Sequence, residues 1–303
     1  KKGDNNAEME SIVLEKGFQM GFPHNVEKEA EMLEKRAKPI PQKDIAKRRD
    51  FRNITTFTID PEDAKDFDDA ISFRKISDDL FEIGVHIADV SHYVREGGRL
   101  DEEAAHRGVS IYLVDRTIPM LPEVLSNDIC SLNPREDKLT FSAVMTISSD
   151  GHIKNVWLGR TVINSNKRFV YEEAQKSLDE KRGDYYDELD RLDKIAKIFK
   201  GKRMALGALD FDKEEVKFKL DAKGKPVSIV EKPRLDVHKL VEEFMILANR
   251  EVASYLSGEI KKINKGASIY RVHDTPKKEA VDELLVFLRV LGHEIEAKGE
   301  NIS

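Results

Sequence analysis

Apolar and polar residues alternate through much of the first half of the chain. The alternation is clearest in the runs TTFTI, AISFRKI, LFEIGVHIADV, LTFSAVMTI and IKNVWLGRTVI, which lie between residues 51 and 163. Because successive side chains of a strand point to opposite faces, this period of two predicts strands. Turn residues at 148–151 (SSDG) and 221–226 (DAKGKP) separate neighbouring runs and predict hairpins with antiparallel pairing.

Apolar residues recur every three or four positions in the second half of the chain. This spacing predicts helices over about 185–206, over about 236–262 and from Thr275 onward. Gly207 follows the first of these segments as a helix stop, and Pro276 stands in the first turn of the third.

The order of these elements predicts the fold class. Strands that precede helices without regular alternation are typical of an α+β fold, here a mixed, largely antiparallel sheet flanked by helices. Residues 1–50 are polar, with two short amphipathic stretches, and are interpreted as a helical lead-in or linker. Residues 51–303 are interpreted as the main domain, and an apolar content of 40% is enough to fill its core.

Cysteine usage and hydropathy exclude several classes of protein. Cys130 is the single cysteine, so an internal disulfide framework and a cysteine-rich zinc site are excluded. No apolar run approaches the ~20 residues that span a bilayer. We therefore expect a cytoplasmic protein with no membrane partner.

The negative charge of the chain is concentrated in one place. The formal net charge is -6, which is unusual for a protein that holds a polyanion. Six acids and one base lie between Thr58 and Ala70. Such a segment would repel phosphate groups unless cations lay between the two, so the charge pattern favours a metal site.

The segment TIDPEDAKDFDDA carries the candidate chemistry. It lies between two predicted strands, so we expect the stretch from Asp60 to Asp69 to form a loop at a sheet edge, with Asp66 and Asp68 in it. Carboxylates are the hard oxygen ligands that magnesium prefers, and a loop can bring several of them to one point. In two-metal hydrolysis of phosphodiesters the ions lie ~3.5–4 Å apart.

Three other interpretations of the acidic segment stay open at this stage. The first is a solvated surface loop with no role, although Pro61 and Phe67 within the run make an idle loop less expected. The second is a calcium loop, but the sixth and twelfth positions counted from Asp60 do not hold the Gly and Glu of that motif. The third is a structural cluster that is neutralised by Arg48, Arg49 and Arg52.

The segment RRDFRNITTFTIDPEDAKDFDDAIS resembles the signature block of the ribonuclease R and ribonuclease II (RNB) family of processive 3′-to-5′ exoribonucleases. The segments HIADVSHYV, RGVSIYLVDRTIPMLPEVLSNDICSLNP, GALDF, VEEFMILANREVA and YRVHDTP follow in the order of that family, across roughly residues 48–276. The resemblance implies hydrolysis of single-stranded RNA from its 3′ end to nucleoside 5′-monophosphates, through metal-assisted attack of water. It also implies Mg²⁺ as the cofactor, with Mn²⁺ as a possible substitute.

The resemblance implies roles for single residues. Asp60, Asp66 and Asp68 match the metal-site aspartates of the family. Asp69 matches the aspartate, also at the metal site, whose loss is expected to harm turnover more than RNA binding.

Three further residues match the part of the family motif that holds RNA. Tyr112 and Phe211 match an aromatic pair that clamps the terminal bases, and Glu243 matches an acid near the terminal nucleotide. Stacking on aromatics is worth ~1–3 kcal/mol per base and tolerates any base. Judged by pattern alone, Tyr112 and Phe211 are ordinary core aromatics and Glu243 borders a helix stripe, so both interpretations stay open.

Part of the family pattern is absent from this sequence. No segment like the later Ser-Pro-Ile-Arg-Arg-Tyr stretch, which supplies a catalytic arginine, is present. We expect the sequence to be a catalytic domain that is truncated at its C-terminal end and weakly active or inert alone. In the full-length protein, expected to be a monomer, cold-shock and S1 modules would flank it and contribute RNA binding. The alternative function is a non-catalytic RNA-binding or scaffold protein on the same fold.

Overall fold

A computed structural model describes residues 5–209, 215–221, 224–263, 266–267, 269–270, 272, 274–293, 297–298 and 301–302. The chain forms two compact units, Lys1–Val252 and Ala253–Ser303. No described helix is both long and apolar enough to cross a membrane.

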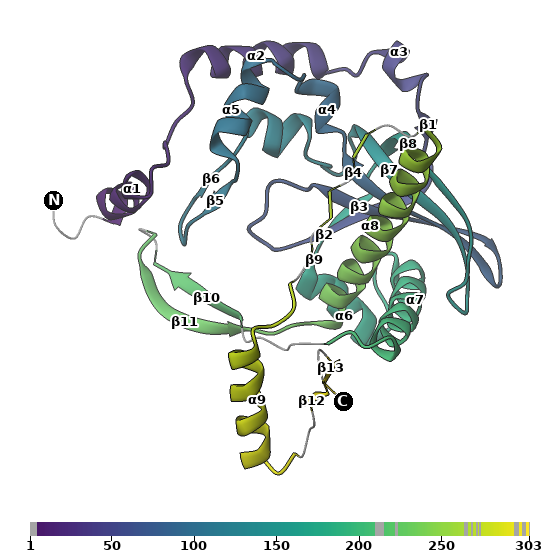
Figure 1. Cartoon of the computed structure of the whole chain (residues 1–303). Coiled ribbons are helices and arrows are strands. Elements are labelled where there is room, and N and C mark those ends of the chain that lie inside the picture. The colour runs from purple at the N-terminus through teal and green to yellow at the C-terminus, as the bar shows by residue number, and fades with distance from the viewer. Residues whose placement is uncertain are drawn as a thin grey trace. The chain divides into compact units, whose positions relative to one another are not determined.

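A seven-stranded sheet forms the centre of the first unit (Figure 1). Its order is β1-β8-β7-β4-β3-β2-β9, with these bounds: β1 Arg49–Asp50, β2 Thr55–Asp60, β3 Asp69–Ser77, β4 Leu80–Ala88, β7 Asp137–Ser148, β8 Ile153–Asn164 and β9 Lys167–Val170. The central strands pair antiparallel, whereas β1 runs parallel to β8 and β9 runs parallel to β2. The expected mixed, largely antiparallel sheet is therefore confirmed.

One face of the sheet carries the main hydrophobic core. Phe57, Ile83 and Met145, from three different strands, are fully buried on this face. They pack with apolar residues of α6 (Tyr171–Glu180), α7 (Tyr186–Ala205) and α8 (Asp236–Ile263), including Leu192 and Phe244. The buried residues of the alternating strands and of the helices with three-four spacing thus pack in one core, as an α+β fold requires.

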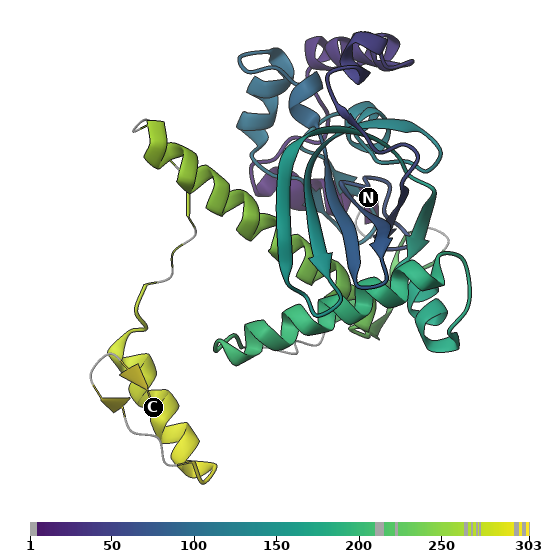
Figure 2. The same cartoon turned by 90° about the vertical axis from the view of Figure 1, so that its right-hand side faces the viewer.

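The opposite face is covered by the N-terminal part of the chain. Val26 and Ala30 of α2 (His24–Ala37) pack with Leu100 of α5 (Arg99–Arg107), with Leu125 of the π-helix η1 (Val124–Ile129), and with Val144 of the sheet. Figure 2 shows the sheet between the green α7 helix and the purple and blue helices of this N-terminal region. The predicted lead-in is helical, but its boundary with the main domain stays a prediction.

The remaining elements are short or lie in hairpins. They are α1 Asn5–Glu15, α3 Gln42–Ile45, α4 Val90–Tyr93, β5 Ile111–Tyr112, β6 Thr117–Ile118, β10 Glu215–Leu220, β11 Pro226–Lys232, α9 Lys278–Val290, β12 Ala297–Lys298 and β13 Asn301–Ile302. The hairpin expected at 221–226 is present as the antiparallel pair β10–β11, and Gly224 supplies its positive φ of 75°.

A polar network lies inside the sheet around His86. The imidazole is fully buried, with Nδ1 2.7 Å from the Ser142 hydroxyl and Nε2 2.8 Å from the Ser72 hydroxyl. Gly84 lies close beside this network, because a Cβ there would come 2.5 Å from the Ser72 oxygen and 2.6 Å from the imidazole. Both ring nitrogens are therefore satisfied, and the histidine is structural rather than a metal ligand.

Protonation of His86 is expected to couple folding to pH. Burial, together with the positive charge of Arg49, lowers the pKa of His86 to about 3, whereas an unfolded chain has a histidine pKa of ~6.5. Between these values only the unfolded chain binds the proton. The contribution of neutral His86 to the free energy of unfolding is therefore complete above pH ~6.5, and it falls by ~1.4 kcal/mol per pH unit as the pH decreases below that value. Urea unfolding at pH 7 and pH 5 should show a smaller pH effect for His86→Gln than for the wild type. Equal pH effects in the two proteins would contradict this coupling.

Candidate functional site

The four candidate aspartates lie at the junction of β2 and β3. Asp60 is the last residue of β2 and Asp69 is the first of β3, and we call the intervening residues 61–68 the acidic loop. The loop was expected at a sheet edge, but β2 is not an edge strand, because β9 pairs with its outer side. The parallel partner β9 comes from a distant part of the sequence, which a local pattern does not predict.

The second half of the acidic loop is fixed by the segment that follows η1. The Phe67 amide donates to the Ser131 hydroxyl at 3.0 Å, and that hydroxyl donates to the Lys65 carbonyl at 2.9 Å. The Leu132 amide donates to the Phe67 carbonyl, and the Ala88 amide donates to the Asp68 carbonyl. Phe67 is buried in the core on this side of the sheet. The loop is thus an anchored part of the fold and not an idle solvated segment.

The carboxylates raise each other's affinity for positive charge. Burial raises the pKa of Asp60 to about 7, and the charges of Asp69 and Asp66 add to this increase. Burial, followed by the charge of Asp68, raises the pKa of Asp69 to about 6. Partial burial of the Asp68 carboxylate, followed by the charge of Asp66, raises the pKa of Asp68. Such a group of carboxylates is stabilised when a cation lies among them.

The donor set fits a divalent cation. Oδ2 of Asp60 is buried and has no hydrogen-bond partner in the described part of the chain, so an acceptor is available inside the site. The side chains do not, however, already meet at one point: among the described residues, no three His, Cys, Asp or Glu side chains form a group that could hold a metal ion. A cation bound by three of them would therefore require these side chains to move closer together.

The acidic segment is not a structural cluster whose charge is neutralised by the neighbouring arginines. Arg48 pairs with Asp89, and Arg49 pairs with Glu82. Arg52 pairs with Asp50 and Asp137. These three arginines are committed elsewhere in the fold, so that interpretation of the acidic segment was wrong.

Tyr112 is the candidate RNA contact that the structure places beside the aspartates. Its side chain is 68% exposed, and its hydroxyl donates a long hydrogen bond of 3.4 Å to Oδ2 of Asp66. The interpretation of Tyr112 as a core residue was therefore wrong. Phe211 lies outside the described residues, so its suggested partnership with Tyr112 stays a prediction.

Glu243 is placed differently from Tyr112. It is only 3% exposed, on α8, and Arg203 of α7 donates to Oε1 of Glu243 at 2.5 Å. Arg203 also contacts Glu242, so this ion pair links the two helices. The suggested role of Glu243 near a terminal nucleotide stays a prediction.

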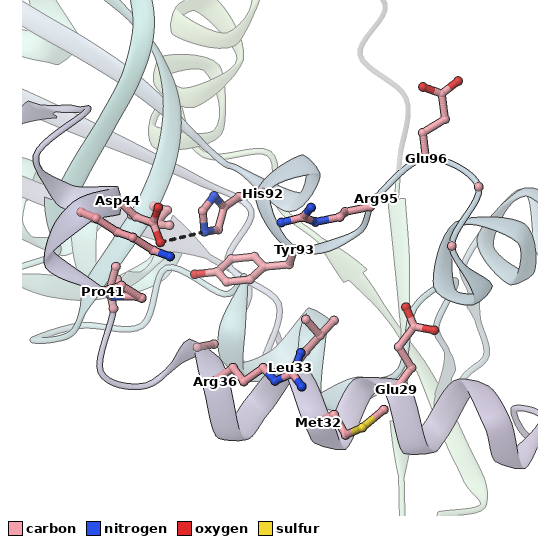
Figure 3. A pocket seen from close by; sticks show the side chains of 16 residues that line it. Glu29, Met32, Leu33, Arg36, Pro41, Asp44, His92, Tyr93, Arg95 and Glu96 are labelled. Carbon is pink, nitrogen blue, oxygen red and sulfur yellow. Dashed lines mark ion pairs between the residues drawn. The ribbon is translucent and has the colours of Figure 1, made fainter.

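A large cavity in the described part of the chain is separate from the acidic loop. It has a volume of about 890 Å³ and lies between α2, α3 and the segment around His92. In Figure 3 the His92 imidazole faces Asp44, with 3.9 Å between Nε2 and Oδ2, next to the Tyr93 ring. None of the four aspartates lines it, so this cavity is not part of the candidate site.

Sequence reasoning missed Ser131 and Arg168, which hold the acidic loop from other parts of the chain. Arg168 lies on β9, and its guanidinium donates to the carbonyls of Pro61 and Glu62. Neither residue has a local signal, because each acts on backbone more than 60 residues away.

Comparisons with known proteins identify the family. The RNB domain matches residues 48–302. Ribonuclease R 1 of Lactococcus lactis is 38% identical over 287 residues, which are 93% of this chain and 34% of that protein. Ribonuclease R of Thermotoga maritima is 42% identical over 277 residues, which are 89% of this chain and 38% of that protein.

A solved structure gives the same result. Mycoplasma genitalium RNase R in complex with ribose-methylated single-stranded RNA matches with a TM-score of 0.89 and 28% identity, over 99% of this chain and 46% of that one. The chain thus spans less than half the length of these three proteins. On the match over residues 48–302, the sequence identities and the shared fold, the chain belongs to the RNB domain family.

Proposed function

We propose that the chain is the nuclease part of a processive 3′-to-5′ exoribonuclease that hydrolyses single-stranded RNA to nucleoside 5′-monophosphates. The observation that carries this proposal is the anchored group of four aspartates beside the exposed ring of Tyr112. Family membership supports it, because the relatives are named ribonuclease R and one was solved with single-stranded RNA.

In this proposal the aspartates hold Mg²⁺, or Mn²⁺ in its place. A cation bound there would neutralise charge on the scissile phosphate and lower the pKa of the attacking water. Asp60, Asp66 and Asp68 would be its main ligands, and Asp69, also at the metal site, would orient the water for in-line attack. The water oxygen would form a new bond to phosphorus as the bond from phosphorus to the 3′ oxygen breaks. That oxygen takes a proton and becomes the 3′ hydroxyl of the shortened RNA, and the released nucleotide keeps the phosphate on its 5′ oxygen.

Tyr112 supplies the hold on the substrate in this proposal. The ring is exposed and its hydroxyl is tethered to Asp66, so a terminal base that stacks on the ring lies beside the carboxylates. Stacking does not discriminate between bases, which suits an enzyme that degrades RNA of any sequence.

The proposed function is tested with 5′-labelled single-stranded RNA and Mg²⁺, using both this chain and the full product of its gene. The expected result is progressive shortening from the 3′ end, with nucleoside 5′-monophosphates released and no cleavage of a circular RNA of the same sequence. EDTA should stop the reaction. Shortening from the 5′ end, cleavage of the circle, or an absence of metal-dependent cleavage by the full product would refute the proposal.

A non-catalytic RNA-binding protein on the same fold is the second candidate. The absence of a preformed metal group among the described residues favours it. The presence of all four aspartates argues against it, because a protein that only binds RNA gains nothing from four mutually repelling carboxylates. RNA binding by the full product without any turnover would favour this candidate.

Replacement of Tyr112 is expected to weaken RNA binding. Tyr112→Ala removes the stacking surface and should cost ~1–3 kcal/mol of binding free energy, which is about 5- to 150-fold in Kd. Tyr112→Phe keeps the ring and loses only the long hydrogen bond to Asp66, so its Kd should stay close to that of the wild type. Fluorescence polarisation with a labelled oligonucleotide in EDTA measures both. If the Ala variant binds as tightly as the Phe variant, Tyr112 is not a stacking residue.

A further inference from the structure

The two halves of the acidic loop are attached to the fold in different ways. The second half is held by Ser131, Leu132 and Ala88. In the first half, a single turn bond is found among the described backbone groups, in which the Ala64 amide donates to the Pro61 carbonyl at 3.1 Å. A contact from outside the loop can therefore add to what holds the residues that follow Asp60.

Arg168 makes that contact from the neighbouring strand. In the parallel pairing of β2 and β9 it lies opposite Thr58, two residues before Asp60. One nitrogen of its guanidinium donates to the Pro61 carbonyl and also to the Glu62 carbonyl, at 2.9 Å for the latter. The guanidinium carbon lies 5.3 Å from the centre of the Phe67 ring, so the same side chain spans the loop from its first residues to its buried aromatic.

The contact has an unfavourable component as well. Nε of Arg168 is buried and has no hydrogen-bond partner within the described chain, and a buried unsatisfied donor costs ~1–3 kcal/mol. A lysine in this place would bring no buried Nε–H and could still reach a carbonyl. It would not present the flat guanidinium that covers Phe67 while bonding to the loop, because an ammonium is a point charge.

We propose that Arg168 is a positioning residue of the metal site. By binding the carbonyls of Pro61 and Glu62, it fixes the direction in which the chain leaves Asp60 and keeps that carboxylate within reach of the cation shared with Asp66 and Asp68. The inference rests on the proposed function for its catalytic consequence, but the hold of Arg168 on the loop can be measured without RNA or metal.

Two substitutions and one control test the proposal. Arg168→Met removes the donors but keeps much of the aliphatic volume, whereas Arg168→Lys keeps one cationic donor. Arg135→Met is the matched control, because Arg135 lines the same cavity of about 690 Å³ as Arg168, is exposed, and shows no hydrogen bond to the acidic loop within the described structure. Thermal unfolding of each variant identifies any loss of overall stability.

The first readout is amide hydrogen exchange without metal or RNA. The reporter is the Ala64 amide, because its acceptor is the Pro61 carbonyl that Arg168 also binds. Arg168→Met should accelerate exchange at Ala64 at least about tenfold relative to amides of β7, with a smaller change in Arg168→Lys and none in Arg135→Met. Unchanged exchange at Ala64 in Arg168→Met would overturn the proposal, whatever the activity of the protein.

The second readout is metal affinity and steady-state kinetics. Loss of a residue that orients metal ligands typically costs 10- to 100-fold in metal affinity or activity. In the full gene product, we expect Arg168→Met to weaken Mn²⁺ binding, measured by calorimetry, and to lower kcat by this factor, with KM for RNA within about twofold and partial rescue in Arg168→Lys. An effect confined to KM, or equal effects in Arg135→Met, would show that the cavity lined by Arg135 and Arg168 binds RNA through the charge of these arginines. Either result would overturn the positioning role. If the full gene product lacks nuclease activity but Ala64 exchange and Mn²⁺ binding respond as expected, the proposed function fails and the structural role of Arg168 stands.

Discussion

Replacing Asp69 by asparagine is expected to reduce RNA turnover at least about 100-fold while RNA affinity stays within about twofold of the wild type. Loss of one preorganised electrostatic group at a reacting centre costs ~10²–10³ in kcat. Asparagine has nearly the same size but carries no charge and cannot hold a cation or orient water as a carboxylate does. Because the pKa of Asp69 is already raised to about 6 by burial and by Asp68, removal of its charge relieves repulsion and should not destabilise the fold.

The matched control for Asp69→Asn is Glu62→Gln. This substitution removes one negative charge from an exposed side chain of the same acidic loop, so it reproduces any general change in attraction for RNA. Turnover is measured as mononucleotide release under saturating RNA, and affinity is measured in EDTA. Normal turnover by Asp69→Asn, or an equal loss of turnover in Glu62→Gln, would show that turnover does not depend on a charge at the start of β3.

Local patterns were sufficient for most of the sheet and for the long helices. The runs TTFTI and AISFRKI correspond to β2 and β3, and the segments expected at 185–206 and 236–262 correspond to α7 and α8. These elements have one buried face, so a regular period is present in the sequence. The elements η1 and β9 were not expected. They are only 6 and 4 residues long, respectively, and the residues they pair or pack with define them more than a pattern of their own.

The candidate site was predictable only in part. The concentration of acidic residues identified the segment from Asp60 to Asp69, because many charges of the same sign in one loop repel each other and require a physical explanation. The roles of Arg48 and Arg168 were not predictable, because arginines next to the loop in sequence pair elsewhere and a distant arginine binds the loop. The exposure of Tyr112 was equally hidden, since a period of two marks a strand but does not say which face is buried.

Replacing Arg48 by methionine is expected to lower the free energy of unfolding by ~3–5 kcal/mol, the usual cost of removing one partner of a buried ion pair. The side chains of Arg48 and Asp89 are 3% and 2% exposed, with 2.6 Å between the guanidinium and Oδ2 of Asp89. Arg48 also donates to the Thr140 carbonyl at 3.1 Å, so its loss leaves a second buried acceptor without this donor. Burial opposes ionisation of Asp89, but hydrogen bonds from Arg48 and Ser91 outweigh it and lower the pKa of Asp89.

Urea unfolding at pH 7 measures the effect, with Arg52→Met as the control. Arg52 pairs with Asp50 and Asp137 at the surface, where the three side chains are 32%, 46% and 35% exposed, so its loss should cost no more than ~1 kcal/mol. In the double variant Arg48→Met with Asp89→Asn, the buried charge is gone and part of the stability should return, because the largest cost in Arg48→Met is the charge left on Asp89. Arg160 lies 3.6 Å from Asp89 and is itself 56% exposed, so it can compensate only partly for Arg48. A double variant that is less stable than Arg48→Met would mean that the hydrogen bonds of Asp89, and not its unpaired charge, determine the loss.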